Sequence, residues 1–162
     1  MEFKEFAIMR NASASADFIR NVRALPADKL TWKPAPDTRS ALEICQEVAQ
    51  SPMWGVRILA NRGWGGGSPE EMGAQMEQAM AEQQSWDTVD KCEVAMTANL
   101  ERLAESIKAF PDDELTNMVH LPFGEGMDLQ LAEICMVQNW NSTYHLGQIC
   151  YIQLMNGDKD MH

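Results

Sequence analysis

Basic residues are scarce in this 162-residue chain. Thirteen Lys and Arg residues stand against 24 Asp and Glu residues, and the formal net charge is −11. A chain this acidic repels the phosphate backbone of nucleic acids and the headgroups of anionic lipids. We therefore expect neither a nucleic-acid partner nor a membrane partner.

Long apolar runs are also missing. No stretch approaches the roughly 18 consecutive apolar residues that indicate a membrane-spanning helix. The opening run, MEFKEFAIMRNASASA, is interrupted by charge every few residues, so it lacks the apolar region of a secretory signal peptide. This pattern predicts a cytoplasmic location.

Cysteine motifs do not occur. The four cysteines form neither a CxxC pair nor a zinc-finger pattern, and they are Cys45, Cys92, Cys135 and Cys150. In a cytoplasmic protein we expect them to be reduced and buried, as small fillers of the core.

Nucleotide-binding and serine-hydrolase motifs are missing too. The glycine cluster RGWGGG at 62–67 is followed by no GK[ST], which favours a turn over a phosphate cradle. No Gly-x-Ser-x-Gly elbow surrounds any serine. His120 follows a helix-ending proline in an expected loop and His162 is the last residue, so we expect both in solvent.

What the chain does contain is helical periodicity. Apolar residues recur every three or four positions over about 3–25, 40–62, 88–109 and 128–155. No segment alternates as a strand does, and no composition shift marks a domain boundary. We therefore predict one all-α domain over 1–162, a four-helix bundle with long connections and an extra short helix that begins at Ser68.

Local signals refine two of these helices. Ser40 and Glu43 form a capping box at the start of the second bundle helix, and Pro52 predicts a kink near its middle. In the extra helix, Met72, Met76 and Met80 recur at every fourth position, which predicts a core-facing stripe. Large aromatics such as Trp140 are also expected in the core, with the wall of a pocket as the alternative.

The last predicted helix has an unusual stripe. Its core-facing positions include four consecutive polar members and are Ile134, Gln138, Asn141, His145, Gln148 and Ile152. A buried polar group without a hydrogen bond costs roughly 1–3 kcal/mol. The stripe is therefore either a satisfied structural network or a site. Breaking a structural pair predicts a loss of about 3–5 kcal/mol for His145→Ala, whereas a solvated pocket predicts about 1 kcal/mol or less.

Both ends of the chain resemble the DinB/YfiT-like metalloenzyme family. The run LPADKLTWKPAPDTRSALEICQEVAQ (25–50) is similar to the family opening, in which a Leu-Pro connection and a Trp-x-Pro segment lead into a capped helix. The run NWNSTYHLGQICYIQLMNGD (139–158) is similar to its C-terminal signature, a histidine followed by x-Gly-Gln and an apolar stretch. The resemblance implies a four-helix bundle.

The resemblance also implies a metal site, which this sequence alters. Family members hold a divalent metal through a histidine on the second helix and an HxxxH pair on the last helix. Those positions are Glu47, Asn141 and His145 in this chain, so only one of the three histidines is kept. Such a set is a weak one for Zn, Ni or Fe.

Two functions follow from the resemblance. The first is binding of an unknown small molecule in a bundle pocket whose metal site has degenerated. The alternative is a divalent-metal-dependent transferase, similar to the thiol S-transferases, or a hydrolase, so whether the chain is an enzyme stays open. A homodimer is one option for its oligomeric state.

Overall fold

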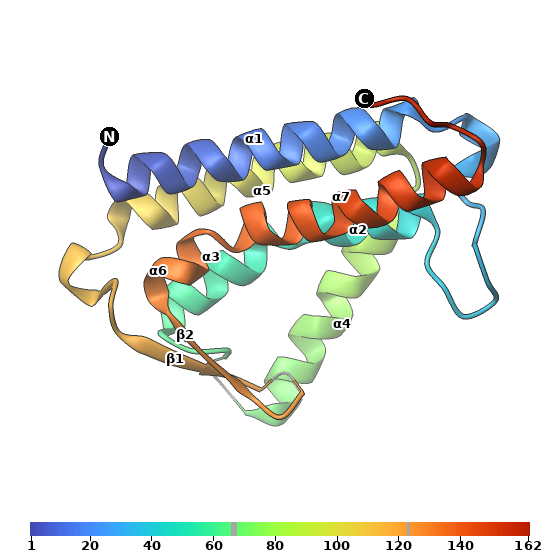
Figure 1. Ribbon diagram of the computed structural model, residues 1–162. Helices are drawn as coiled ribbons and strands as arrows, with labels where there is room; N and C mark the ends of the chain where they lie inside the picture. The colour runs from blue at the N-terminus through green and yellow to red at the C-terminus, as the bar shows by residue number, and fades with distance from the viewer. Residues whose placement is uncertain (66–67, 123) are drawn as a thin grey trace.

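Four long helical segments lie side by side in the computed structural model, which describes residues 1–65, 68–122 and 124–162 (Figure 1). The segments are α1 (Phe3–Ala24), the pair α2 (Ala41–Gln50) and α3 (Pro52–Asn61), α5 (Val89–Ala109) and α7 (Val137–Met155). α1 packs against α5 and α7, and the α2–α3 pair packs against the same two helices. The predicted four-helix bundle is confirmed.

The first and last bundle helices run in the same direction. Asn11 of α1 donates to the carbonyl oxygen of Cys135, just before α7, at 2.8 Å. Farther along both helices, Gln153 of α7 donates to the carbonyl oxygen of Asn21 of α1 at 2.9 Å. Between them, Ser15 Oγ and Ser142 Oγ are 3.3 Å apart. Small side chains at this contact let the two helices approach closely.

Helix boundaries follow the local signals. Ser40 Oγ accepts from the backbone N–H of Glu43 at 3.3 Å, and the Glu43 carboxylate accepts from the N–H of Ser40 at 2.7 Å, so the predicted capping box is confirmed. α1 ends immediately before Leu25 and Pro26, and α5 ends immediately before Phe110 and Pro111. Proline removes the donor that a further turn would need.

The second bundle helix is broken at Ser51 and Pro52. Because Pro52 has no N–H, the carbonyl of Val48 lacks its usual donor four residues on. Two side chains replace that donor: Ser51 Oγ at 2.9 Å and Gln138 Nε2, from α7, at 3.2 Å. α2 and α3 thus meet at a local interruption, across which Ser51 keeps helical dihedral angles (φ −60°, ψ −28°), and polar groups of the bundle interior stabilise it.

The expectation of no strand is wrong. β1 (Met118–Leu121) pairs antiparallel with β2 (Met127–Gln130), and the helix expected from 128 begins instead with α6 (Leu131–Cys135) and continues as α7. A four-residue strand has too short an alternation to stand out in sequence and forms only against its partner. His120 lies on β1, exposed as expected, with Nδ1 2.8 Å from Asp128 Oδ1.

The extra helix is longer and more exposed than expected. α4 (Pro69–Ser85) has 17 residues and projects away from the bundle (Figure 1). Met80 is 54% exposed and Met76 is also exposed, so the prediction that this methionine stripe fills the core is wrong. The i, i+4 spacing identifies a helix face, but no other element covers this one enough to bury it.

The cores of the bundle contain three of the four cysteines. Cys45 and Cys92 lie in one hydrophobic cluster and Cys135 in a second, whereas Cys150 is only half-buried.

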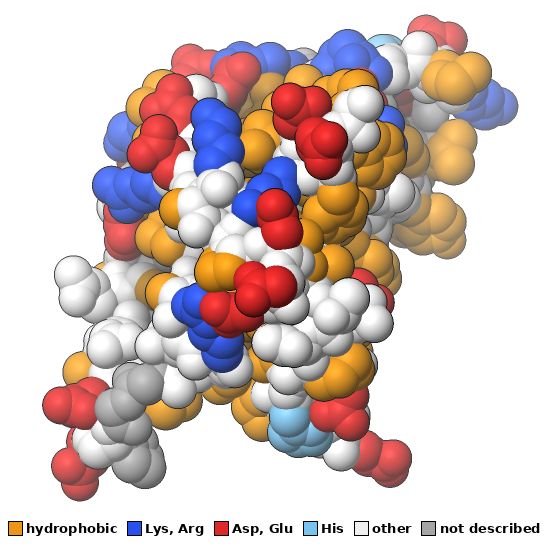
Figure 2. Space-filling model, turned by 90° about the vertical axis from the view of Figure 1, so that its left-hand side faces the viewer, with side chains coloured by type: hydrophobic (Ala, Val, Ile, Leu, Met, Phe, Trp, Pro, Cys, Tyr) orange, Lys and Arg blue, Asp and Glu red, His pale blue; other side chains and the backbone are white. Residues whose placement is uncertain are grey.

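Trp140 is 62% exposed on α7, so its expected place in the core is wrong. Seen from the end of the bundle, hydrophobic side chains gather on the right, the side that α7 faces (Figure 2).

Within the described part of the chain, no helix is both long and apolar enough to cross a membrane.

Candidate functional site

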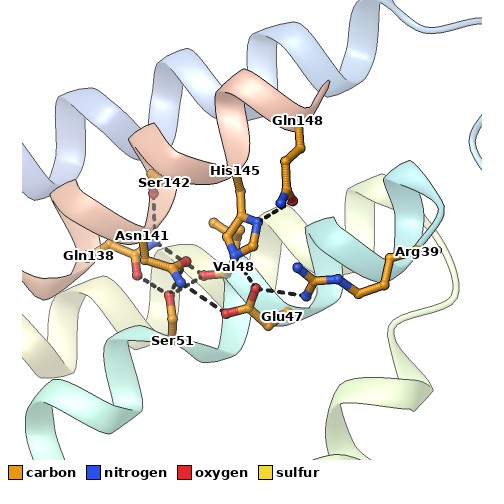
Figure 3. Close-up of polar contacts among 9 residues, drawn as sticks. All are labelled: Arg39, Glu47, Val48, Ser51, Gln138, Asn141, Ser142, His145 and Gln148. Carbon is orange, nitrogen blue, oxygen red and sulfur yellow. Dashed lines mark hydrogen bonds and ion pairs between the residues drawn. The ribbon is translucent and has the colours of Figure 1, made fainter. Parts of the chain in front are cut away.

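The polar stripe of α7 faces the interior as predicted. Gln138, Asn141 and His145 are buried, and Gln148 lies half-buried at the outer end of the stripe. The same face of α7 lies over α2, which places Glu47 opposite the stripe (Figure 3). The polar side chains of two helices therefore meet inside the bundle.

Glu47, Asn141 and His145 are in direct contact. Asn141 Nδ2 donates to Glu47 Oε1 at 3.0 Å, and His145 Nε2 lies 2.5 Å from Glu47 Oε2. Because Asn141 and His145 are four residues apart on one helix face, one carboxylate can reach both. The structure thus brings together all three residues that the sequence singled out.

A basic side chain lies at the outer edge of this cluster. Arg39 Nη1 is 3.3 Å from Glu47 Oε2, and the arginine side chain is 46% exposed. Burial pushes the pKa of Glu47 upward, but the contacts with His145, Asn141 and Arg39 outweigh burial and hold that pKa below its usual value. Glu47 is therefore held as a carboxylate.

His145 has an acceptor beside each ring nitrogen. Nδ1 is 2.7 Å from Gln148 Oε1, and Nε2 faces the Glu47 carboxylate. Both ring nitrogens are therefore engaged by side-chain oxygens.

Ser51 carries the network deeper into the bundle. Its hydroxyl proton has three acceptors within reach: Val48 O at 2.9 Å, Asn141 Oδ1 at 3.0 Å, and Gln138 Oε1. One proton cannot serve three acceptors fully, so the oxygens compete for it. The amide of Asn141 nevertheless has one favoured orientation, because its nitrogen must face the carboxylate of Glu47.

Gln138 links this network to α1. Its amide nitrogen donates to Ser15 Oγ at 3.1 Å and to Ser142 Oγ at 3.0 Å. Hydrogen bonds and ion pairs therefore run without interruption from exposed Arg39 to buried Ser15. Such networks couple their members, so removing one weakens the others.

Four members of the network were not predicted from the sequence, namely Arg39, Ser51, Ser15 and Ser142. Arg39 immediately precedes the cap residue Ser40, and only the folded chain shows that its side chain reaches a glutamate eight residues on. Ser51 precedes Pro52, and the proline was a usable signal because it frees a carbonyl that a neighbouring hydroxyl can bind. Ser15 has no local signal, since its partners lie on α7.

The donor set does not fit a tightly held transition metal. Among the residues that the structure describes, no group of three or more His, Cys, Asp or Glu side chains is placed to hold a metal ion. Glu47 and His145 are of ligand type but pair with each other, and Asn141 turns its nitrogen toward Glu47. A metal would have to break these contacts to reach them.

Two cavities lie away from this cluster. One of about 260 Å³ opens between α1 and α5 and is lined mainly by apolar side chains such as Ile8 and Leu100. One of about 450 Å³ lies beside Trp86 and the outer face of α5, with Glu82 and Arg102 on its walls. Neither is lined by Glu47, Asn141 or His145.

Comparison with known proteins gives matches to solved structures. No family model and no curated protein matches the chain by sequence. YfiT from Bacillus subtilis, described as a probable metal-dependent hydrolase with an unusual four-helix bundle topology, superposes with a TM-score of 0.69 at 12% identity, covering 96% of this chain and 89% of YfiT. The DinB-like protein YjoA from Bacillus subtilis gives 0.63 at 12% identity, covering 96% and 95%.

A mycothiol-dependent maleylpyruvate isomerase also matches, with a TM-score of 0.63 at 11% identity. The match covers 92% of this chain but only 63% of the isomerase, so this chain spans less than two thirds of that protein. Likeness at 11–12% identity carries the fold and no activity. The chain therefore has the four-helix-bundle fold of the DinB/YfiT-like proteins.

Proposed function

We propose that this chain binds a small molecule at the Glu47–Asn141–His145 cluster, and that these positions have lost the metal-binding role they have in the DinB/YfiT-like family. One observation carries the proposal. The ring nitrogens of His145 and both carboxylate oxygens of Glu47 are each engaged by protein groups. Protein hydrogen bonds thus occupy the atoms that would ligate a metal.

The charges of the cluster favour an anionic ligand. Glu47 contributes one negative charge and Arg39 one positive charge, and the His145 ring lies against the Glu47 carboxylate. The positive charge lies at the outer edge of the cluster, where the half-exposed guanidinium of Arg39 can turn toward a ligand without breaking the Glu47–His145 contact. A planar guanidinium pairs well with a carboxylate, so we propose small carboxylic acids as the ligand class.

Metal content tests the loss of the metal site. We expect untagged wild-type protein to hold well under one Zn, Ni or Fe per chain by elemental analysis. The double variant Glu47→His/Asn141→His rebuilds three imidazoles and should bind close to one metal per chain. Adding His145→Ala to that variant is the matched control and should abolish the gain. About one tightly held metal per wild-type chain would overturn the proposal.

Ligand binding is tested separately. Calorimetric titration with a panel of small mono- and dicarboxylates should find binders, whereas the matching amides should not bind. Arg39→Gln should weaken that binding at least tenfold. Equal binding of acids and amides would contradict the assigned ligand class without bearing on metal content.

The second candidate is a divalent-metal-dependent transferase or hydrolase. It is favoured by the fold shared with YfiT and by the juxtaposition of a carboxylate and an imidazole, which are both metal ligands. If the Glu47–His145 contact opened, each would offer one ligand atom. Hydrolysis or thiol transfer that appears on adding Zn or Ni to wild-type protein, and disappears with a chelator, would establish this function in place of the first.

A further inference from the structure

The outward face of α7 carries an exposed apolar stripe. Its members lie at spacings of four, three, four and three residues, which places them on one face of a helix, and they are Trp140, Tyr144, Gly147, Tyr151 and Leu154. Tyr151 is 63% exposed and Trp140 is exposed to a similar extent. Water-exposed aromatic side chains in a row are typical of a surface that another molecule covers.

The same helix contains no acidic residue and neither Lys nor Arg. Between Val137 and Met155 there is no Asp, Glu, Lys or Arg, although 23% of the whole chain is charged. With a net charge of −11, two copies of the chain repel one another at most orientations. An uncharged face is where that repulsion is least, and a second copy presents the same uncharged aromatic surface.

The stripe is symmetric in sequence about Gly147. Trp140 and Leu154 lie seven residues before and after it, and Tyr144 and Tyr151 lie three before and four after. We propose that two copies of this chain pair through α7, antiparallel about a two-fold axis near Gly147. Tyr144 of each copy then contacts Tyr151 of the other, as an isologous interface requires.

Gly147 leaves room for the close approach that this pairing needs. A Cβ placed on this residue would meet no other atom within 4 Å, so the centre of the stripe is open toward solvent. Large aromatic side chains flank the opening on either side. Two helices crossing at a glycine can approach more closely than at any other residue.

Part of the surface is ordered before pairing. The rings of Trp140 and Tyr144 stack with centroids 5.6 Å apart and 17° between their planes, and Tyr144 meets the ring of His145 edge-on at 5.0 Å. Little side-chain entropy is then lost on association. The contact with His145 also places the interface directly beside the polar cluster.

The size of the face indicates a weak dimer. A 19-residue helix is about 28 Å long and one face of it about 10 Å wide, which gives a footprint on the order of 300 Å² per copy. Standard interfaces bury about 800 Å² per partner. We therefore expect association in the micromolar range or weaker, visible as a concentration-dependent equilibrium.

Sedimentation velocity over a wide concentration range tests the pairing. Wild-type protein should shift from monomer to dimer as its concentration rises. Tyr144→Glu and Tyr151→Lys should each raise the dissociation constant at least tenfold, because each places a charge against an aromatic ring. The double variant Tyr144→Glu/Tyr151→Lys should recover the dimer, because antiparallel pairing brings the two opposite charges together.

Val94 provides the matched control. It is an apolar residue on the outer face of α5 and is 72% exposed, so Val94→Glu should leave the dimer unchanged. Circular dichroism of every variant excludes unfolding as a cause. A wild-type chain that stays monomeric at all concentrations, a Val94→Glu variant that dissociates equally, or a double variant that fails to recover would each overturn the proposal.

Discussion

α5 and α7 are bundle helices of similar length, but the kinds of side chain that they bury and expose are reversed. α5 buries apolar side chains, including Met96, Leu103 and Ile107, and exposes charged ones. α7 buries mostly polar side chains and exposes aromatic ones, with Gln138 inside and Trp140, two residues on, outside. Both helices pack in the same bundle, yet they contribute to it through different kinds of buried side chain.

The comparison separates stability from function. Apolar burial on α5 stabilises the fold in proportion to the area removed from water, about 25 cal/mol per Å². The inner face of α7 stabilises it only as long as each buried polar group keeps its partner. Leucines at those positions would stabilise the fold without needing partners, and the proposed site gives a reason for the polar side chains that stand there instead.

The largest predicted effect on stability comes from the apolar buried face of α5. Leu103→Ala on α5 removes a fully buried side chain and should lower the free energy of unfolding by about 2–5 kcal/mol. Urea denaturation followed by circular dichroism measures it. A loss below about 1 kcal/mol would mean that α5 is not the stabilising helix that its packing indicates.

The next largest effect on stability comes from the polar buried face of α7. His145→Ala leaves the buried carboxylate of Glu47 without its closest partner, which should cost about 3 kcal/mol. Arg39 stays beside Glu47 and keeps the loss at the lower end of the range for broken buried pairs. Glu47→Gln combined with His145→Ala should cost less than the sum of the single changes, because the pair is lost only once. Additive losses would show that the two residues act independently.

The pH dependence of stability should carry a smaller signature of Glu47. Because the folded-state pKa of Glu47 lies below its usual value near 4.5, the folded chain binds fewer protons at this group than the unfolded chain. Its contribution is therefore complete above the unfolded-state pKa and is lost as pH falls through the folded-state pKa. Chemical denaturation between neutral and acidic pH should show a steeper loss for wild type than for Glu47→Gln. Parallel curves would contradict the assigned role.

The smallest effect is expected on the outer face of α7. Tyr151→Ser removes a large aromatic ring, but that ring is in solvent, so the stability of the monomer should change by no more than about 0.5 kcal/mol. Val94→Ser on α5 is the matched change. Thermal melts at low protein concentration compare the two. A clear destabilisation by Tyr151→Ser alone would show that this face packs within the monomer.

Much of the candidate site could be predicted because its members follow a helical period. Asn141 and His145 share a face by their spacing, and the cap at Ser40 sets the position of Glu47 along α2. The helical period does not indicate which residues on other elements complete the contacts of the site. Arg39 contacts Glu47 and Gln148 contacts His145 at the outer edge of the cluster, and the contact with Arg39 is one that the period of α7 does not predict.

The sequence by itself determined the features that depend on a single turn of chain. Helix caps, proline stops and the direction of the polar stripe are local, because the groups involved lie within four residues of one another. Only the tertiary structure decided which faces are covered and which groups pair across helices. Exposed Met80 and Trp140, the pairing of β1 with β2, and the contact between Arg39 and Glu47 all depend on elements that the folded chain brings together or leaves apart.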